Sequence, residues 1–432
     1  MVVDILEKQP STAATKAHET MITLGQNARE AYSKLARATT EQKNAALVAM
    51  AKEVRAAAKK ILAGNEKDIA AAKANRASAA YLDRLALSPV RIEAIAKGLE
   101  EVAKQPDPVG KKLESWDRPN GLKISKVSVP LGVIGVIFES RPNVTADAAA
   151  LCLKAGNAVI LRCGSDSFNS SQAIEEALQK GLENAGLPKE AVQLVPTTDR
   201  AAVTEMLQMN EYIDIIVPRG GKSLNEKVKE SSKIPTLLHL EGNNHTYIHS
   251  SADAAMAVKV VHNAKLRRTG ICGATESLII DSAVSDKLLP KIVDELVKGN
   301  CEVKGDEKAM LADKRIKAAS PADWFKEYLD AVISIKTVEN VDEAIEHVNF
   351  YGSHHTDAII AEDTKAVEKF LNEVDSAIVM HNTSTQFADG GEFGFGGEIG
   401  ISTGRLHARG PVGSAQLTTY KYIVEGSGQL RP

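Results

Sequence analysis

Cysteine is scarce in this sequence, with four residues in 432: Cys152, Cys163, Cys272 and Cys301. No two of them form a CxxC pair, and no histidines stand at the spacing that a zinc site needs. Four cysteines in so long a chain are also too few for a disulfide framework. The scarcity therefore argues against a structural zinc site and against a cross-linked secreted fold, and we expect reduced thiols.

The sequence also lacks an excess of charge of either sign. Its 53 basic side chains are balanced by 56 acidic ones, which leaves a net charge of -3 with no long block of one sign. Bulk electrostatics therefore do not support a nucleic-acid or membrane-surface partner. No long uncharged apolar run is present, and the first ten residues lack a basic segment followed by an apolar core. We expect a cytoplasmic protein.

What is present is the composition of an ordinary globular protein, with 44% hydrophobic and 25% charged residues. A chain of 432 residues is about three times the usual length of one domain, so two or three domains are expected. No segment repeats with a period of twenty to fifty residues, which excludes a solenoid.

Both ends of the chain have a clear local pattern. Residues 15–104 are rich in alanine, lysine, glutamate and leucine at helical spacing, which predicts a helical region. Two alternating polar runs around the sequence PNG predict a β-hairpin over residues 114–130. Near the other end, LTTYKYIV (417–424) alternates as well, and it predicts an exposed strand that pairs with its own chain or with another subunit.

Between residues 131 and 240, short β-branched runs alternate with helical segments. The predicted strands cover residues 132–138, 157–162, 192–195, 212–217 and 236–240, and the predicted helices cover 147–156, 170–186 and 199–209. Strand and helix in alternation predict a parallel, doubly wound sheet. Ligands of such sheets bind beyond the carboxyl ends of the strands.

A second alternating series begins after Cys272 and predicts a second α/β domain. Its strands are expected at residues 276–281, 331–335, 357–361 and 376–380, and its helices at 286–299 and 342–349. A glycine-rich stretch, GEFGFGGEIGIST, follows this series and is typical of a shaped loop with close backbone approach. The fold class predicted is α/β, with two doubly wound parallel-sheet domains.

Among the four cysteines, Cys272 is the best candidate for chemistry. It lies in KLRRTGICGATESL, where glycines leave little side-chain packing around it and basic residues precede it. Positive charge and oriented backbone N–H groups favour the reactive thiolate form of a cysteine. The alternative is a small buried core residue, which is the usual state of free cysteine and fits Cys152 in its apolar helix. The neighbouring residues leave both interpretations of Cys272 open.

Two other segments have both a chemical and a structural interpretation. In FESRPNVTAD, the side chain of Asn143 could donate to a developing oxyanion or could cap the next helix. In IVPRGGKSLN, the backbone at Gly220 and Gly221 could hold a phosphate at a helix N-terminus or form only a tight turn. The usual dinucleotide fingerprint GxGxxG is absent after the first strand, so any dinucleotide would bind by another route.

Taken together, these segments resemble the aldehyde dehydrogenase superfamily, and within it the reductases that act on glutamyl phosphate. The resemblance extends from about residue 20 to 425 and is carried by SVPLGVIGVIFESRPNVTADAAALCLKAGNAVILR, HLEGNNHTYI, NAKLRRTGICGATESLII, EYLDAVISI, YGSHHTDAII and GEFGFGGEIGISTGRLHARGPVG. It implies an aldehyde dehydrogenase-like fold with a cofactor-binding domain over residues 1–265 and a catalytic domain over 266–385. Residues 386–432 would form a return loop and an oligomerisation strand, to which the hairpin 114–130 would project.

The resemblance implies an enzyme that reduces L-glutamyl 5-phosphate to L-glutamate 5-semialdehyde with NADPH and releases phosphate. This is the second step of proline biosynthesis from glutamate. Cys272 matches the superfamily's nucleophile, which forms a thioacyl intermediate, and Asn143 matches its oxyanion-hole asparagine. A homo-oligomer is implied as well, and glutamate 5-kinase is a candidate pathway partner.

The resemblance also implies contacts to the cofactor NADP(H). Arg162 takes the place of a basic residue near the adenosine ribose. Ser165 stands where NAD-selective relatives often have an acid, which favours the 2'-phosphate of NADP(H). Gly220 and Gly221 resemble the glycine turn that faces the cofactor, and Glu327 resembles the acid that binds the nicotinamide ribose. No metal is implied.

The basic residues Arg141, Lys265, Arg268 and Arg409 are candidate contacts for the anionic groups of the substrate. Glu241 stands where hydrolytic aldehyde dehydrogenases have a general base that activates water. Because water would waste the thioacyl intermediate of an acyl phosphate reductase, we assign Glu241 no catalytic role. Two alternative functions are a hydrolytic aldehyde dehydrogenase that uses Glu241, and a non-catalytic family member that serves as a binding subunit.

Overall fold

The structure is a computed structural model that describes residues 12–238 and 241–431. The chain divides into two compact units. Unit 1 comprises Met1–Leu237, Phe395–Gly400 and Val412–Pro432, and unit 2 comprises Leu238–Gly394 and Ile401–Pro411. Each unit has its own parallel sheet, as the sequence predicts.

The sheet of unit 1 has four parallel strands in the order β5-β4-β3-β6. Their bounds are Val133–Phe138 for β3, Ala158–Cys163 for β4, Val192–Leu194 for β5 and Ile215–Arg219 for β6. Every residue of β3 and β4 is buried, which matches their nearly uninterrupted apolar sequences. The chain order reverses between β3 and β6, and this switch point is where an open α/β sheet binds its ligand.

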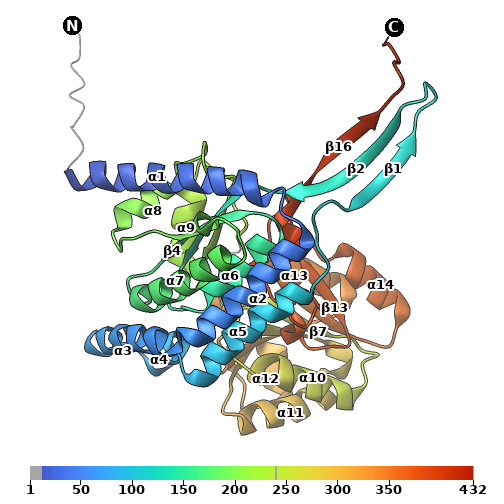
Figure 1. Ribbon diagram of the computed structural model, residues 1–432. Helices are drawn as coiled ribbons and strands as arrows, with labels where there is room; N and C mark the ends of the chain where they lie inside the picture. The colour runs from blue at the N-terminus through green and yellow to red at the C-terminus, as the bar shows by residue number, and fades with distance from the viewer. Residues whose placement is uncertain (1–11, 239–240, 432) are drawn as a thin grey trace, which may run out of the picture. The chain divides into compact units, whose positions relative to one another are not determined.

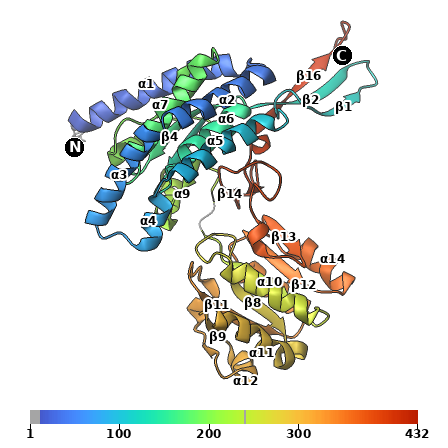
Figure 2. The ribbon, with the colours of Figure 1, turned by 60° about the horizontal axis from the view of Figure 1, so that its bottom comes forward.

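Helices cover this sheet, and the amino-terminal region is helical as predicted (Figures 1 and 2). The helices of unit 1 are α1 (Thr12–Leu35), α2 (Thr40–Ala56), α3 (Ala58–Ala74), α4 (Ala79–Leu85), α5 (Pro89–Lys104), α6 (Val144–Lys154), α7 (Phe168–Asn184), α8 (Arg200–Met206), α9 (Lys222–Ser231) and the short η1 (Lys189–Ala191) and η4 (Ala415–Leu417). Local sequence fixes their starts: Thr39 and Gln42 form a capping box for α2, and Ser88 caps α5. Helices α1, α6, α7 and α9 contact the strands, and α2 packs against α5 and α7.

The predicted hairpin is present, and the predicted carboxyl-terminal strand joins it. Strands β1 (Lys112–Asp117), β2 (Lys123–Pro130) and β16 (Thr418–Glu425) form an antiparallel sheet in the order β1-β2-β16. Pairing of β16 with β2 runs over its whole length, so the partner of this strand lies in the same chain. In Figure 1 the three strands extend away from the helices of unit 1 as an arm. The outer edges of β1 and β16 have no strand beside them within the described residues.

The sheet of unit 2 has seven parallel strands in the order β10-β9-β11-β8-β7-β12-β13. They are β7 (Asn244–Ile248), β8 (Thr275–Asp281), β9 (Glu302–Gly305), β10 (Lys317–Ala318), β11 (Val332–Val338), β12 (Thr356–Ile360) and β13 (Ile378–His381). The helical elements are α10 (Ala254–Leu266), α11 (Ser282–Lys298), α12 (Glu307–Ala312), η2 (Pro321–Phe325), α13 (Val341–Tyr351), α14 (Thr364–Glu373) and η3 (Thr385–Phe387). A small pair of strands, β14 (Ile401–Ser402) and β15 (Gly410–Pro411), completes the unit. Among the helices that the structure describes, none could span a bilayer by length and apolarity.

The predicted domain boundary differs from the division between the units. The predicted boundary between the cofactor-binding and catalytic domains lies after residue 265, whereas the compact units divide at Leu237/Leu238. The reason is β7, which pairs with β8 on one side and β12 on the other and therefore belongs to the second sheet. The segment 386–432, predicted as one element, is also shared between the two units.

One predicted strand is hardly present. Residues 236–240 were expected to extend the first sheet, but only Thr236 forms an isolated bridge, with Ile216. Residues 239–240 lie outside the described residues. One of the strands that the sequence did not predict, β7, has the mostly polar sequence NHTYI and is nevertheless completely buried.

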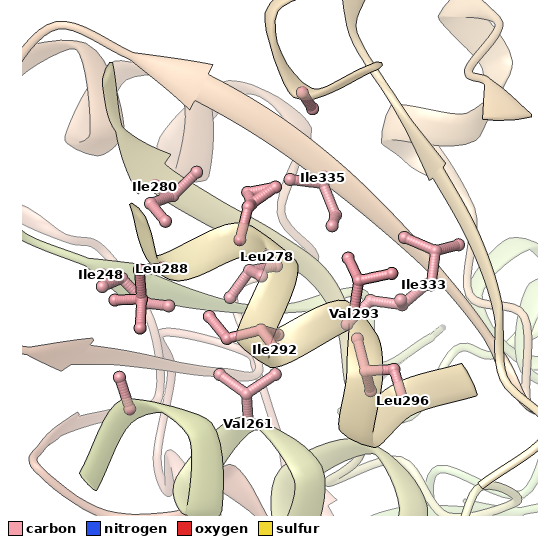
Figure 3. Packing of buried hydrophobic residues seen from close by; sticks show 14 of the residues in the cluster. Ile248, Val261, Leu278, Ile280, Leu288, Ile292, Val293, Leu296, Ile333 and Ile335 are labelled. Carbon is pink, nitrogen blue, oxygen red and sulfur yellow. The ribbon is translucent and has the colours of Figure 1, made fainter. Parts of the chain in front are cut away.

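The core of unit 2 is built around one amphipathic helix. Helix α11 directs Leu288, Ile292 and Leu296, at spacings of four residues, against the strands (Figure 3). From the sheet, Leu278 of β8 and Ile335 of β11 belong to the same cluster. This contact fixes β8, and the segment that precedes β8 carries Cys272.

Truncating this core is expected to destabilise the protein. Leu278 is completely buried, so Leu278→Ala should lower the free energy of unfolding by about 2 to 5 kcal/mol through lost burial and a residual cavity. The matched control is Leu311→Ala, because Leu311 is 73% exposed and its truncation should change stability by less than about 0.5 kcal/mol. Urea unfolding followed by circular dichroism measures both, and equal shifts of the midpoint would contradict the assignment.

Candidate functional site

In unit 1, the candidate residues gather at the carboxyl ends of the strands. Arg141 and Asn143 follow β3, Ser165 follows β4, and Gly220 and Gly221 follow β6. Because the strands are parallel, these ends lie on one edge of the sheet. Strands β3 and β6 are neighbours at the switch point, so this edge has the position expected of a ligand site.

In unit 2, the candidate residues lie at the opposite ends of the strands. Glu327 precedes β11, Cys272 precedes β8 and Glu241 precedes β7. These three strands are adjacent in the order β11-β8-β7. The amino ends of neighbouring parallel strands therefore bring together side chains that are far apart in the sequence.

Cys272 lies in the turn between α10 and β8 and is partly exposed. The side-chain Nδ2 atom of Asn244 donates to the backbone carbonyl oxygens of Cys272, at 2.6 Å, and of Ala274, at 3.0 Å. Gly242 lies against the same turn, where a Cβ atom would be 2.2 Å from the carbonyl oxygen of Cys272. Any side chain at position 242 would therefore push the cysteine turn away.

Gly242 also connects this turn to Glu327. Its backbone N–H donates to Oε1 of Glu327 at 2.9 Å. The adjacent Asn243 donates from its side chain to the carbonyl oxygen of Trp324, also at 2.9 Å. Cys272 and Glu327 thus both contact Gly242, and Glu241 directly precedes this glycine in the sequence.

The other three cysteines are core residues. Cys152, Cys163 and Cys301 are all buried. Burial raises the pKa of the Cys152 thiol, and it raises the pKa of Cys163 and of Cys301 to about 12 in each case. Of the four cysteines, all of which the structure describes, only Cys272 is not buried, which favours the nucleophile over the core interpretation.

Asn143 stands at the N-cap position of α6, but among the described residues its side chain makes no capping hydrogen bond to the helix backbone. Its Nδ2 atom donates instead to Oδ2 of Asp147, one turn further along, at 2.8 Å. Burial raises the pKa of Asp147 to about 6, although the hydrogen bond from Asn143 works in the opposite direction. Asp147 therefore orients an amide whose second N–H can serve another acceptor.

The residues implied for a dinucleotide have suitable chemistry at the carboxyl edge of unit 1. Arg162 is 7% exposed; its Nη2 atom donates to the carbonyl oxygen of Thr198 at 3.0 Å. The buried Nε atom of Arg162 has no hydrogen-bond partner among the residues described. Ser165, three residues further along the chain, is exposed. Gly221 is the N-cap of α9, a helix long enough for its N-terminus to favour an anion.

The four candidate anion contacts differ in their surroundings. Lys265 is completely buried and forms an ion pair with Glu276, so its ammonium group already has a carboxylate partner. Arg409 forms an ion pair with Asp375 at 2.8 Å. Of the remaining two, Arg141 is partly buried and Arg268 is exposed.

Sequence reasoning did not identify several residues that hold the site together. One of them, Asp147, could have been found, because Asn143 and Asp147 have the i, i+4 spacing of neighbours on a helix. The contacts of Gly242 and Asn244 with Cys272 have no such local signal. They join the amino-terminal ends of two strands that are distant in the sequence, and only the pairing of β7 with β8 brings these ends together.

Comparison with known proteins identifies relatives over nearly the whole chain. A model of the aldehyde dehydrogenase family matches residues 6–311 and 324–423. The chain is 60% identical over 412 residues to the gamma-glutamyl phosphate reductase of Paramagnetospirillum magneticum, covering 95% of this chain and 97% of that protein. It is 58% identical over 420 residues to the enzyme of the same name from Rhodopseudomonas palustris, with 97% of each chain covered. A crystal structure of gamma-glutamyl phosphate reductase from Thermotoga maritima matches with a TM-score of 0.94 at 43% identity, covering 96% of this chain and 100% of that one.

The environments of the four cysteines predict selective alkylation by iodoacetamide. Cys272 should react at least about tenfold faster than the other three, because burial and a raised pKa leave those thiols inaccessible and protonated. Peptide mapping by mass spectrometry measures the extent of labelling at each position with time. The variant Cys272→Ala should lose the fast phase, whereas equally fast labelling of Cys163 or Cys301 would contradict the assignment.

Proposed function

The chain belongs to the aldehyde dehydrogenase family, and we propose that this oxidoreductase reduces L-glutamyl 5-phosphate to L-glutamate 5-semialdehyde with NADPH through a thioester on Cys272. Identity over nearly the full length to gamma-glutamyl phosphate reductases supports the substrate. The observation that carries the mechanism is the partly exposed Cys272, which Gly242 and Asn244 hold beside Glu327.

In the first step, the thiolate of Cys272 attacks the acyl carbon of the substrate. A carbon–sulfur bond forms, the bond from that carbon to the phosphate oxygen breaks, and phosphate leaves with its electron pair. The oxygen of the acyl group becomes negative as the carbon turns tetrahedral. We propose that the amide of Asn143, oriented by Asp147, donates to this oxyanion together with the backbone N–H of Cys272.

The chemistry of unit 1 suits a phosphorylated dinucleotide. When bound, NADPH supplies the hydride that reduces the thioester to the aldehyde level. Arg162, with its buried Nε atom, and the neutral Ser165 would hold the 2'-phosphate, and an acid in place of Ser165 would repel it. The turn at Gly220 and Gly221 would face the cofactor phosphates through backbone N–H groups at the start of α9.

We assign the two units different roles on this basis. Unit 1 would bind the cofactor, and unit 2 would carry the nucleophile and, through Glu327, hold the ribose of the nicotinamide half. Arg141, Arg268 and Arg409 remain proposed contacts for the anionic groups of the substrate. The open edges of β1 and β16 support assembly of a homo-oligomer through this sheet.

Dependence on phosphate tests the proposed reaction. In the reverse direction, oxidation of glutamate 5-semialdehyde with NADP+ should require phosphate, because phosphate must release the acyl group from Cys272. Initial rates of NADPH formation with and without phosphate measure this, and Cys272→Ala should abolish them while Cys152→Ala does not. Equal rates without phosphate would identify a hydrolytic aldehyde dehydrogenase instead.

A second test concerns the oxyanion. Asn143→Ala should lower kcat of the reductase by about 100-fold to 1000-fold, the usual loss of one oxyanion donor, and should change KM for the acyl phosphate much less. The control is Asn75→Ala, because Asn75 is exposed at the end of α3 and lies in unit 1 as well. Steady-state kinetics measure both variants. An unchanged kcat in Asn143→Ala would exclude the proposed role.

A further inference from the structure

Unit 2 contains a completely buried ion pair that the mechanism above does not use. Lys265, near the end of α10, and Glu276, the second residue of β8, are both 0% exposed and bind each other. Removing two charges from water is costly, and such a pair often adds no net stability compared with apolar residues of similar size. A function other than stability therefore has to be considered for this pair.

The second oxygen of the Glu276 carboxylate shows what the pair holds. It accepts a hydrogen bond from the backbone N–H of Leu329 at 3.2 Å. Leu329 has a φ of 53°, in the left-handed region that a residue with a branched side chain rarely occupies. Such a conformation persists only where neighbouring groups impose it. Glu276 is one of those groups, and Leu329 lies two residues after Glu327.

Glu276 binds the segment between η2 and β11 on the carboxyl-terminal side of Glu327, whereas the other contacts described here bind it at or before Tyr328. Between η2 and β11 the chain has no regular secondary structure, so side chains hold it. Asn243 and Gly242 bind Trp324 and Glu327, as described above. The hydroxyl group of Tyr328 donates to Asp323 at 2.8 Å, which ties the segment back to η2. Beyond Tyr328, the bond to Glu276 fixes the direction in which the chain leaves Glu327.

The charge of Lys265 keeps Glu276 able to accept that bond. Burial raises the pKa of Glu276 to about 7, although the ammonium group of Lys265 and the N–H of Leu329 both lower it. The negative charge of Glu327 raises it further. Without Lys265, protonation of the Glu276 carboxyl group would be favoured, and the group would then compete as a donor.

We propose that the Lys265–Glu276 pair is a positioning device for Glu327, and that it thereby sets the affinity of unit 2 for the nicotinamide half of the cofactor. The inference rests on the ribose-binding role proposed for Glu327. It also explains the place of Glu276 in the sequence. Because Glu276 follows Cys272 by four residues at the start of β8, one strand end holds both the nucleophile and the anchor of the cofactor-binding carboxylate.

The experiment separates positioning from stability by replacing both charges at once. The double variant Lys265→Met and Glu276→Leu keeps the buried volume but removes the acceptor for Leu329. A second double variant, Lys265→Met and Glu276→Gln, restores an uncharged acceptor. The control replaces an exposed pair of α11, by Lys298→Met and Glu295→Leu, and Glu327→Gln is the reference for the proposed ribose contact.

Three measurements are made on each full-length variant: the dissociation constant of NADP+ by isothermal titration calorimetry, the midpoint of urea unfolding, and the alkylation rate of Cys272. The Met and Leu variant should unfold close to the wild-type midpoint but bind NADP+ about tenfold more weakly, the loss of one hydrogen bond to a charged group. The Met and Gln variant should recover affinity to within about threefold, and the exposed-pair control should match the wild type. Alkylation of Cys272 should change by less than about twofold in all of them.

Combining the Met and Leu variant with Glu327→Gln gives the decisive comparison. Residues that act through one another are not additive, so the triple variant should bind NADP+ about as weakly as Glu327→Gln alone. Two results would overturn the proposal while leaving the role of Glu327 intact. One is a loss of affinity for NADP+ of about 100-fold in the triple variant, which means that the separate losses multiply. The other is wild-type affinity in the Met and Leu variant. Wild-type affinity in Glu327→Gln would instead disprove the ribose contact, and the positioning role would fall with it.

Discussion

The close approach of Gly242 to Cys272 is the contact on which the site of unit 2 depends. Position 242 has no room for a side chain, because a Cβ atom there would be 2.2 Å from the carbonyl oxygen of Cys272. The N–H group of the same residue binds Glu327. Gly242 thus sets the distance of the nucleophile from β7 and also binds Glu327, the proposed cofactor contact. The three segments ahead of β7, β8 and β11 are therefore positioned relative to this one residue.

Gly242 can position these segments only if the strands that follow them are rigid. Hydrogen bonds of buried polar groups connect these strands. The hydroxyl groups of Thr246 on β7 and Thr275 on β8 lie 2.7 Å apart, and Thr385 lies 3.0 Å from Thr275. On the other side, the backbone N–H of His245 donates to Asp357 of β12 at 2.7 Å. A buried polar group is costly unless it is paired, so each of these bonds also fixes the register of its strand. A site held in this way is organised before any ligand binds.

The same polar side chains explain which strands could be predicted from the sequence. Strands β3 and β4 are buried throughout and have nearly uninterrupted apolar sequences, so their sequences are sufficient evidence of strands. Strand β7 begins with Asn, His and Thr, whose buried side chains pair with neighbouring segments, and its only apolar residues are Tyr247 and Ile248 at the end. The sequence therefore did not predict β7, although the second compact unit begins at Leu238, ahead of this strand.

The sequence by itself determined the α/β class, the hairpin and, through its resemblance to a family, the choice of Cys272 and Glu327, because these depend on local pattern or on motifs that can be read in order. Only the tertiary structure decided how those residues are held. The contacts of Glu276 with Lys265 and Leu329 join a strand, a helix and a loop. The packing of α10 against β8 and the pairing of β8 with β11 bring these segments together. No spacing along the chain encodes such a contact, because its energy arises only once the sheet has formed and water has been excluded from the pair.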